Sequence, residues 1–427
     1  MNRILLKGGR LLCPAGGLDQ TGDLLLEDGR VAELGGEIAA ADAQVFDCQG
    51  LVVAPGLIDL HVHLREPGHE YKETIASGTA AAAAGGFTAV CCMPNTDPVN
   101  DTRAVTELIL ERARGASARV YPIGAITKGL AGAELTEMAE LAEAGCVAFS
   151  DDGRPVPQAR LMRRAMEYAA TFAMPIVCHC EEPSLSAGGQ MHEGPVSTRL
   201  GLAGIPAEAE VLGVERDLAL ARLTGARVHI AHISCAGSVQ ALARAKAAGA
   251  RVSGETAPHY LVLCDADVGE YDTNRKMNPP LRSPQDRQAV RQALAQGLIE
   301  AVATDHAPHS VLEKDLEFDQ AAFGVTGLET ALGVMLALVE EGLLTLAQVI
   351  ERMSAAPARL LGLPGGRLQV GGPADVVVID PRRPWTVTPD QFRSLSANNA
   401  FLGRRLPGRA VLTICGGRIT HRLEDAL

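Results

Sequence analysis

The sequence of 427 residues has few aromatic residues and no surplus of basic ones. Aromatic side chains make up 3% of it, and its formal net charge at pH 7 is -12. Proteins that bind nucleic acid usually carry a basic surface, and many stack bases on aromatic rings. The composition therefore predicts no nucleic-acid partner.

Long hydrophobic runs are also missing. The longest apolar run, around residues 331–339, is much shorter than the roughly 20 residues that cross a bilayer. Basic residues interrupt the N-terminal stretch MNRILLKGGRLLCPAGG. The ten cysteines include no CxxC pair and accompany no secretory signal, which favours reduced thiols over disulfides. We expect a cytoplasmic protein without a membrane segment.

The composition does provide for a large core, because 47% of the residues are hydrophobic. From residue 55 to residue 364, short β-rich runs alternate with longer helical stretches. This alternation predicts an α/β fold, namely a (β/α)8 TIM-like barrel, over residues 55–364. Eight candidate strands end near His63, Met93, Gly124, Ser150, His179, His232, Glu255 and Asp305.

Both ends of the chain have a different pattern. Residues 1–54 contain short β runs split by Gly and Asp turns, and residues 365–427 repeat this pattern in ADVVVID and AVLTICGGRIT. Two β-rich ends around one barrel are expected to pair with each other. We predict a small β-sandwich domain made of residues 1–54 and 365–427.

Histidines and one aspartate close four of the candidate strands. His61 and His63 end the first strand, where a period of two points both imidazoles to the same side. His179, His232 and Asp305 end the fifth, sixth and eighth strands, at the rim where barrels carry catalytic residues. Imidazoles and a carboxylate suit Zn²⁺ or a similar divalent ion, which makes bound water ionise near neutral pH. The pattern predicts metal-assisted hydrolysis, with Asp305 as the group that moves the proton.

The same alternation sets other candidates aside. Cys178 and Cys180 flank the histidine of the fifth strand and should point to the opposite face, so the Cys-His-Cys run is a poor zinc site. His229 lies three residues before His232 and is likewise expected on the other face of its strand. His259, in TAPHY, has either a supporting or a structural role.

Longer motifs point to a family. The segments PGLIDLHVHLREPGHEYKETIASGT, CMPNTDPV, FSDDG, HCE, HISCAGS, ETAPHY, KMNPPLR and ATDHAPHS occur in this order. In order and spacing they resemble the bacterial dihydroorotases of the type I class, within the amidohydrolase superfamily, over nearly the whole chain. The resemblance implies a reversible zinc hydrolase that interconverts N-carbamoyl-L-aspartate and L-dihydroorotate, the third step of de novo pyrimidine (UMP) biosynthesis.

The resemblance also extends the metal site to two zinc ions bridged by a carboxylate. The implied ligands are His61, His63 and Asp305 on the first ion, His179 and His232 on the second, and Asp152 between them. Asp152 is chosen over Asp151 because it lies 27 residues before His179, the spacing associated with this class. Asp151 would then support Asp152 without binding the metal. Many relatives bridge their metals with a carboxylated lysine on the fourth strand, but GCVAFSDDG contains no lysine. Two zinc ions per chain are therefore the expectation, and one ion stays open.

The implied substrate is a six-membered cyclic imide with an exocyclic carboxylate. Arg65 lies just beyond the first strand and can hold a carboxylate with both arms of its guanidinium. By resemblance the substrate-binding residues are His63, Arg65, Asn95, Asn278, His309, Phe323 and Gly324. Within this set, Asn95 and His309 join Arg65 on the carboxylate, while Asn278 and the Phe323–Gly324 backbone meet the ring amides.

Each assignment has a simpler alternative. Asn95 and Asn278 could be turn residues, and Arg65 could pair with Glu66 or Glu70 on the surface. The segment 307–326, polar in its middle and bounded by glycine, is a candidate lid over the site.

Two other functions stay open. The first is another cyclic amidohydrolase, such as an allantoinase or a hydantoinase, which Arg65, Asn95 and the missing lysine disfavour. The second is a non-catalytic dihydroorotase-like partner of aspartate transcarbamoylase, which the complete ligand set disfavours. From the family we expect a homodimer, and association with aspartate transcarbamoylase stays open.

Overall fold

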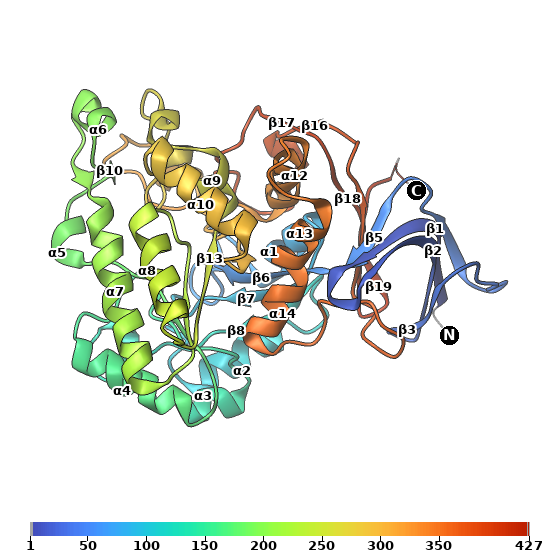
Figure 1. Cartoon of the computed structure of the whole chain (residues 1–427), viewed down its shortest axis with the longest axis horizontal. Helices are drawn as coiled ribbons and strands as arrows, with labels where there is room; N and C mark the ends of the chain where they lie inside the picture. Colours follow the sequence, from blue (N-terminus) through green and yellow to red (C-terminus); the bar gives the residue numbers. More distant parts are fainter. Residues whose placement is uncertain (1–2, 425, 427) are drawn as a thin grey trace.

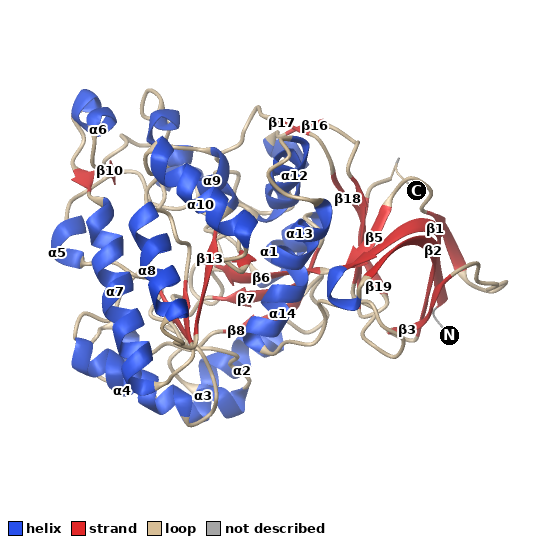
Figure 2. Cartoon of the chain, in the orientation of Figure 1, coloured by secondary structure: helices blue, strands red, loops and turns tan. Residues whose placement is uncertain are grey.

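A computed structural model describes residues 3–424 and 426, and it places a barrel surrounded by helices beside a β-rich domain (Figures 1 and 2). The barrel strands are β6 (Leu57–Val62), β7 (Phe87–Cys92), β8 (Arg119–Pro122), β9 (Ile176–Cys178), β12 (Val228–Ile230), β13 (Val252–Thr256) and β14 (Ala301–Val302). Phe149 takes the fourth position, with parallel bridges to Gly124 and Ile176, and a parallel bridge from Val62 to His306 closes the ring. The predicted barrel is therefore confirmed.

Eight main helices follow these strands in turn and cover the barrel (Figure 2). They are α1 (Ile75–Ala84), α2 (Arg103–Arg112), α3 (Met138–Ala144), α4 (Ala159–Ala170), α7 (Ala207–Thr224), α8 (Ala236–Ala247), α10 (Pro284–Gln296) and α12 (Leu328–Glu340). Local sequence sets their ends. Thr74 accepts a hydrogen bond from the Ser77 N–H at the start of α1, and Ser283 does the same for Asp286 before α10.

Shorter elements lie in the connections. They are the helices α5 (Pro183–Ser186), α6 (Pro195–Leu200), α9 (Pro258–Val262) and α11 (Val311–Lys314), and the strands β10 (Met191–His192) and β11 (Gly204–Ile205). After α12 the chain forms α13 (Leu346–Ile350), a π-helical turn at Glu351–Ala355 and α14 (Ala356–Leu361).

The inside of the barrel is a packed core. Val177 packs with Ile58, Ala231 and Ala301 in one cluster, whereas its neighbours Ile176 and Cys178 belong to the cluster beneath the helices. Successive strand residues thus alternate between the barrel interior and the helix layer, as the pleat requires. This apolar packing inside the barrel supports the polar side chains at the ends of the strands.

Both chain ends build the β-rich domain, as predicted. Its eight strands form one hydrogen-bonded sheet in the order β19-β18-β15-β5-β1-β2-β3, with β4 paired to β1. They are β1 (Arg3–Cys13), β2 (Leu18–Glu27), β3 (Arg30–Gly35), β4 (Gln44–Asp47), β5 (Val52–Pro55), β15 (Val376–Asp380), β18 (Arg409–Cys415) and β19 (Arg418–Arg422). Domain boundaries after residues 54 and 364 stay a prediction.

The strand β15 shows why the two domains are packed closely. Val376 and Val378 point into the core of the β-rich domain, while Val377 and Ile379 join the core of the barrel. A strand that is covered on both faces needs hydrophobic residues at successive positions, and the segment ADVVVID contains such a run. A separate two-stranded ladder of β16 (Trp385–Thr386) and β17 (Arg405–Leu406) lies near α12 (Figure 1).

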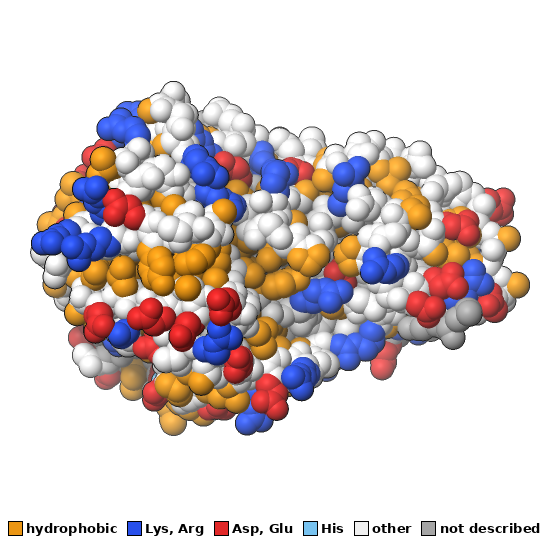
Figure 3. Space-filling view, turned by 90° about the horizontal axis from the view of Figure 1, so that it is seen from below, with side chains coloured by type: hydrophobic (Ala, Val, Ile, Leu, Met, Phe, Trp, Pro, Cys, Tyr) orange, Lys and Arg blue, Asp and Glu red, His pale blue; other side chains and the backbone are white. Residues whose placement is uncertain are grey.

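On the face seen in Figure 3, acidic and basic side chains are interspersed, with apolar patches between them. Within residues 3–424, no helix has the length and apolar character needed to span a membrane.

Candidate metal centre and active site

The predicted ligands meet at the C-terminal mouth of the barrel. His63 and His179 directly follow β6 and β9, and His232 follows β12. All of them are buried, and His61 has no exposed surface at all. The six residues that converge here are His61, His63, Asp152, His179, His232 and Asp305.

Asp152 lies at the centre of this group and divides it into two halves. Its Oδ2 atom is 3.4 Å from His61 Nε2 and 3.5 Å from His63 Nε2. Its Oδ1 atom is 3.5 Å from both His179 Nδ1 and His232 Nε2. One carboxylate oxygen thus faces each pair of histidines, which is the arrangement of a bridging ligand.

Asp305 belongs to the half that contains the HxH motif. Its Oδ1 atom lies 3.2 Å from His63 Nε2 and 3.5 Å from His61 Nε2. On the other half, His179 Nδ1 lies 3.0 Å from His232 Nε2.

This donor set fits divalent cations. Ligand atoms at 2.0–2.2 Å from a tetrahedral zinc ion lie roughly 3.3–3.6 Å apart, close to the spacing between these side-chain atoms. In addition, both ring nitrogens of His61 and the Oδ1 atom of Asp152 are buried without a hydrogen-bond partner among the residues that the structure describes. Buried polar atoms rarely lack a partner, so a cation among them accounts for their geometry.

Electrostatics favour a cation as well. Burial alone would lower the pKa of His61, but Asp152 and Asp305 raise it well above its ordinary value. Burial alone would raise the pKa of Asp305, but His61 and His63 lower it to about 2. The two carboxylates are therefore ionised at neutral pH, and their field attracts positive charge.

Three residues at the ligand cluster and the cavity have a strained backbone. Arg65, His232 and Asp305 have positive φ values of 62°, 37° and 50°. Such angles cost energy for residues other than glycine and tend to occur at functional sites. The turn at His232 also explains one wrong prediction.

His229 was expected to face away from the site, but it lies inside the barrel. Its Nε2 atom is 3.2 Å from Glu255 Oε2, and Glu255 Oε1 is 3.4 Å from His61 Nδ1. The simple alternation fails because β12 ends at Ile230 and the positive φ of His232 turns that side chain inward.

The two cysteines that alternation set aside lie where it placed them. Cys178 and Cys180 are on the helix side, close to Asp217 of α7, and Cys180 Sγ donates to Asp217 Oδ2. His259 is buried, does not line the cavity, and has a pKa lowered to about 4 by burial.

Asp151 does not face the ligands. Its carboxylate accepts hydrogen bonds from the N–H groups of Ile126 and Thr127 and from the Thr127 hydroxyl. It therefore fastens the loop after β8, and its neighbour Asp152 is the one that meets the histidines.

A cavity of about 270 Å³ opens above the ligands. Every residue predicted to bind substrate lines it, and so do five of the six predicted metal ligands, all except His61. The lining residues are His63, Arg65, Asn95, Asp152, Gly153, His179, His232, Asn278, Asp305, Ala307, His309, Phe323 and Gly324.

Arg65 is buried in this cavity, with 9% of its surface exposed. Its Nε atom donates to the Pro308 carbonyl, and within the described part of the chain it forms no ion pair with Glu66, Glu70 or any other acid. The surface pairing considered as an alternative is therefore wrong. A buried guanidinium without an anionic partner is costly unless a ligand supplies the anion.

Two asparagines are oriented by their neighbours. Asn95 Oδ1 lies 2.8 Å from His63 Nδ1, which can donate to it, so the amide nitrogen of Asn95 is left for the cavity. Asn278 Nδ2 donates to Glu181 Oε1, while its Oδ1 atom is buried and finds no hydrogen-bond partner in the described part of the chain. One side chain thus offers the cavity a donor and the other an acceptor.

His309 and Gly324 form the opposite wall. His309 Nε2 lies 3.3 Å from Arg65 Nη2, which can donate to it, and 2.8 Å from the Phe323 carbonyl oxygen, and burial beside Arg65 lowers the pKa of His309 to about 3. Gly324 has a φ of 131°, and a Cβ there would lie 2.8 Å from the Ala307 Cβ. Its N–H donates to the Lys276 carbonyl, so this donor is already used within the protein.

Sequence reasoning assigned no role to three acids that support the site. Glu255 contacts His61, Glu181 orients Asn278, and Asp59 accepts hydrogen bonds from the N–H groups of His61 and Thr304. Charged residues inside GLIDLHVH and RVSGE were the available signal, because acids inside barrel strands are rarely placed there without a partner.

Comparison with known proteins agrees with this geometry. The family description "Dihydro-orotase-like" matches residues 50–238, and "Amidohydrolase family" matches residues 207–421. A dihydroorotase of Syntrophotalea carbinolica is 54% identical over 99% of this chain and 100% of its own length. A dihydroorotase of Desulfotalea psychrophila is 55% identical over 98% of this chain and 99% of its own length.

Among solved structures, an L-hydantoinase (dihydropyrimidinase) from Arthrobacter aurescens is similar, with a TM-score of 0.89 and 27% identity. The match covers 99% of this chain and 96% of the hydantoinase. These full-length similarities complement the converging ligands and the cavity above them. The chain therefore belongs to the dihydroorotase family, a group of metal-dependent cyclic amidohydrolases.

Proposed function

We propose that this protein is a dihydroorotase, which hydrolyses L-dihydroorotate to N-carbamoyl-L-aspartate and catalyses the reverse ring closure. The observation that carries this proposal is the buried Arg65 guanidinium, which lines the cavity beside the ligand cluster and forms no ion pair with any acid among the described residues. A neutral cyclic amide would offer this guanidinium no anion to pair with. The exocyclic carboxylate of dihydroorotate would pair with it.

We infer two zinc ions per chain. His61, His63 and Asp305 would hold one, His179 and His232 the other, and Asp152 would bridge them with its two oxygens. Asp152 follows the fourth strand, where the family often has a carboxylated lysine. When bound, such cations supply hydroxide at neutral pH and polarise an amide carbonyl.

Side chains of the protein would transfer the proton and bind the substrate. Asp305 takes the proton of the attacking water and returns it to the ring nitrogen as the bond between that nitrogen and the carbonyl carbon breaks. Arg65, Asn95 and His309 hold the carboxylate, and Asn278 accepts from a ring N–H. Ring closure uses the same groups in reverse, so the proton and water balance in both directions.

The test combines metal content with substrate choice. We expect about two zinc ions per chain, ring opening of L-dihydroorotate, and little activity on hydantoin or dihydrouracil, which lack the carboxylate. Chelation should abolish activity and zinc should restore it. Preferential opening of the neutral rings would favour the hydantoinase alternative, and full activity with one zinc ion per chain would refute the bridged pair.

Replacing Glu255 by Gln is expected to weaken metal binding by about 10- to 100-fold. Glu255 holds the Nδ1 side of His61 at 3.4 Å, which leaves His61 Nε2 free to act as a ligand. Competition with a chelator measures the affinity. The matched variant Glu341→Gln removes a carboxylate that pairs with Arg291 outside the cavity, and it should leave the affinity unchanged. Equal affinities in both variants would contradict the role of Glu255.

A homodimer, a cytoplasmic location and the absence of a nucleic-acid partner stay predictions from the sequence. The same holds for association with aspartate transcarbamoylase. Size measurement of the purified protein tests the homodimer. The same measurement on a mixture with aspartate transcarbamoylase tests the association.

A further inference from the structure

The loop between β16 and β17 contains a segment, residues 394–399, whose polarity is inverted. Ser394, Ser396 and Asn398 are buried, while Leu395 between them is 59% exposed. In a surface loop the polar side chains would normally face water. Buried polar side chains at every second position indicate that this segment, which we call the rim strap, is held by specific hydrogen bonds.

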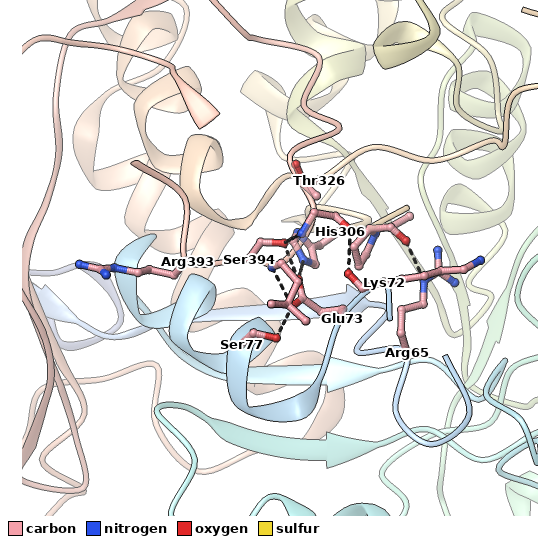
Figure 4. Close-up of polar contacts among 12 residues, drawn as sticks. Arg65, Lys72, Glu73, Ser77, His306, Thr326, Arg393 and Ser394 are labelled. Atoms are coloured by element: carbon pink, nitrogen blue, oxygen red, sulfur yellow. Dashed lines mark hydrogen bonds and ion pairs between the residues drawn. The ribbon is translucent and has the colours of Figure 1, made fainter. Parts of the chain in front are cut away.

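One end of the rim strap is tied to the first βα connection of the barrel. Ser394 Oγ donates to Glu73 Oε2, and the same carboxylate oxygen lies 3.3 Å from His306 Nε2 (Figure 4). Ser396 Oγ donates to the Lys72 carbonyl at 2.7 Å. The strap is therefore anchored to buried groups of the barrel, next to the residue that follows Asp305.

The other end of the rim strap reaches the wall of the substrate cavity. Asn398 Oδ1 accepts from the backbone N–H of His309 at 3.1 Å. Asn398 Nδ2 donates to the carbonyls of Ala307 at 3.2 Å and Gly324 at 3.1 Å. All three partners line the cavity, although Asn398 itself does not.

These contacts join two separate stretches of the rim. Ala307 and His309 come directly after the eighth strand, whereas Gly324 lies at the end of the following loop. The side-chain oxygen of Asn398 accepts from the first stretch, and its amide nitrogen donates to both stretches. These partners fix the orientation of the side-chain amide. The Gly324 carbonyl also accepts from Lys314 Nζ at 3.0 Å.

We propose that Asn398 is a positioning residue for substrate binding, which sets the distance between His309 and the Phe323–Gly324 backbone. This inference rests on the proposed function, because it assigns the effect to binding of the dihydroorotate carboxylate and ring. Among the described residues, the Asn398 side chain forms no hydrogen bond with a proposed metal ligand or with Arg65. Its loss should therefore impair substrate binding and leave metal content unchanged.

The test compares two adjacent asparagines. Asn399 is as buried as Asn398, but its amide nitrogen bonds Thr326 and Thr330, which do not line the cavity. Asn398→Ala should raise KM for dihydroorotate about tenfold or more, with kcat changed much less. Asn399→Ala should lower the melting temperature while KM stays within about twofold of the wild type.

A second variant keeps the shape of the side chain. Asn398→Asp retains the acceptor for the His309 N–H but places a carboxylate oxygen against the carbonyls of Ala307 and Gly324, so KM should rise here too. Hydrogen exchange of peptides covering residues 307–324, measured without substrate, should accelerate in both Asn398 variants and stay unchanged in Asn399→Ala.

Two results would overturn the proposal. One is a KM within about twofold of the wild type in both Asn398 variants, and the other is an equal rise of KM in Asn399→Ala, which would indicate general loosening. Failure of the wild-type protein to open dihydroorotate would instead refute the proposed function. The exchange measurement would then still decide whether Asn398 holds the rim.

Discussion

Replacing Asp305 by Asn is expected to lower kcat for dihydroorotate by about 10²- to 10⁴-fold, the usual range for loss of a general base. The amide has the shape of the carboxylate but cannot take a proton from water. Asp305 lines the cavity, and His61 and His63 keep it ionised at neutral pH by lowering its pKa to about 2. Steady-state kinetics at saturating substrate measure the effect.

The interpretation needs the metal content of the variant, because Asp305 is also a proposed ligand. Activity per bound zinc separates loss of the base from loss of the ion. Asp375→Asn provides the control, since Asp375 is also buried but pairs with Arg119 at 3.1 Å outside the cavity. This control should lose stability and keep its kcat. More than a tenth of the wild-type kcat in metal-loaded Asp305→Asn would contradict the assignment.

The sequence predicted the ligand cluster because its signal is local. His61 and His63 share a side through the period of a strand, and His179, His232 and Asp305 lie within three residues of the end of their own β run. Asp152 was implied by the family resemblance instead. The rule that the carboxyl ends of barrel strands share one mouth then brings these separate residues together. No contact between distant side chains had to be guessed.

The supporting contacts could not be predicted in this way. Glu73 meets Ser394 across 321 positions, and Asn398 meets His309 across 89, in a loop with no periodic pattern. The direction of His229 was predicted wrongly because strand parity assumes regular dihedral angles, which the positive φ of His232 interrupts. Strain of this kind is set by tertiary packing and leaves no mark in a single sequence.

The second large effect is expected from Arg65→Met, which should lower kcat/KM for dihydroorotate by about 10²- to 10⁴-fold. Two charge-assisted hydrogen bonds of roughly 1.5–3 kcal/mol each would be lost, and every 1.4 kcal/mol corresponds to about tenfold. The bond from Arg65 Nε to the Pro308 carbonyl holds the guanidinium at the cavity wall. Methionine fills a similar volume without charge, so the fold should persist.

Metal content and a neutral ring provide the controls for Arg65. Zinc per chain should equal that of the wild type, because Arg65 is not a proposed metal ligand and forms no ion pair with Asp152 or Asp305 in the described part of the chain. The preference for dihydroorotate over dihydrouracil should fall by about the same factor as kcat/KM, since the two rings differ in the carboxylate. Arg65→Lys should recover only part of the loss, because an ammonium group cannot make the paired contact of a guanidinium. Normal turnover by Arg65→Met would refute carboxylate recognition at Arg65, and with it the reason for choosing dihydroorotate over a neutral cyclic amide.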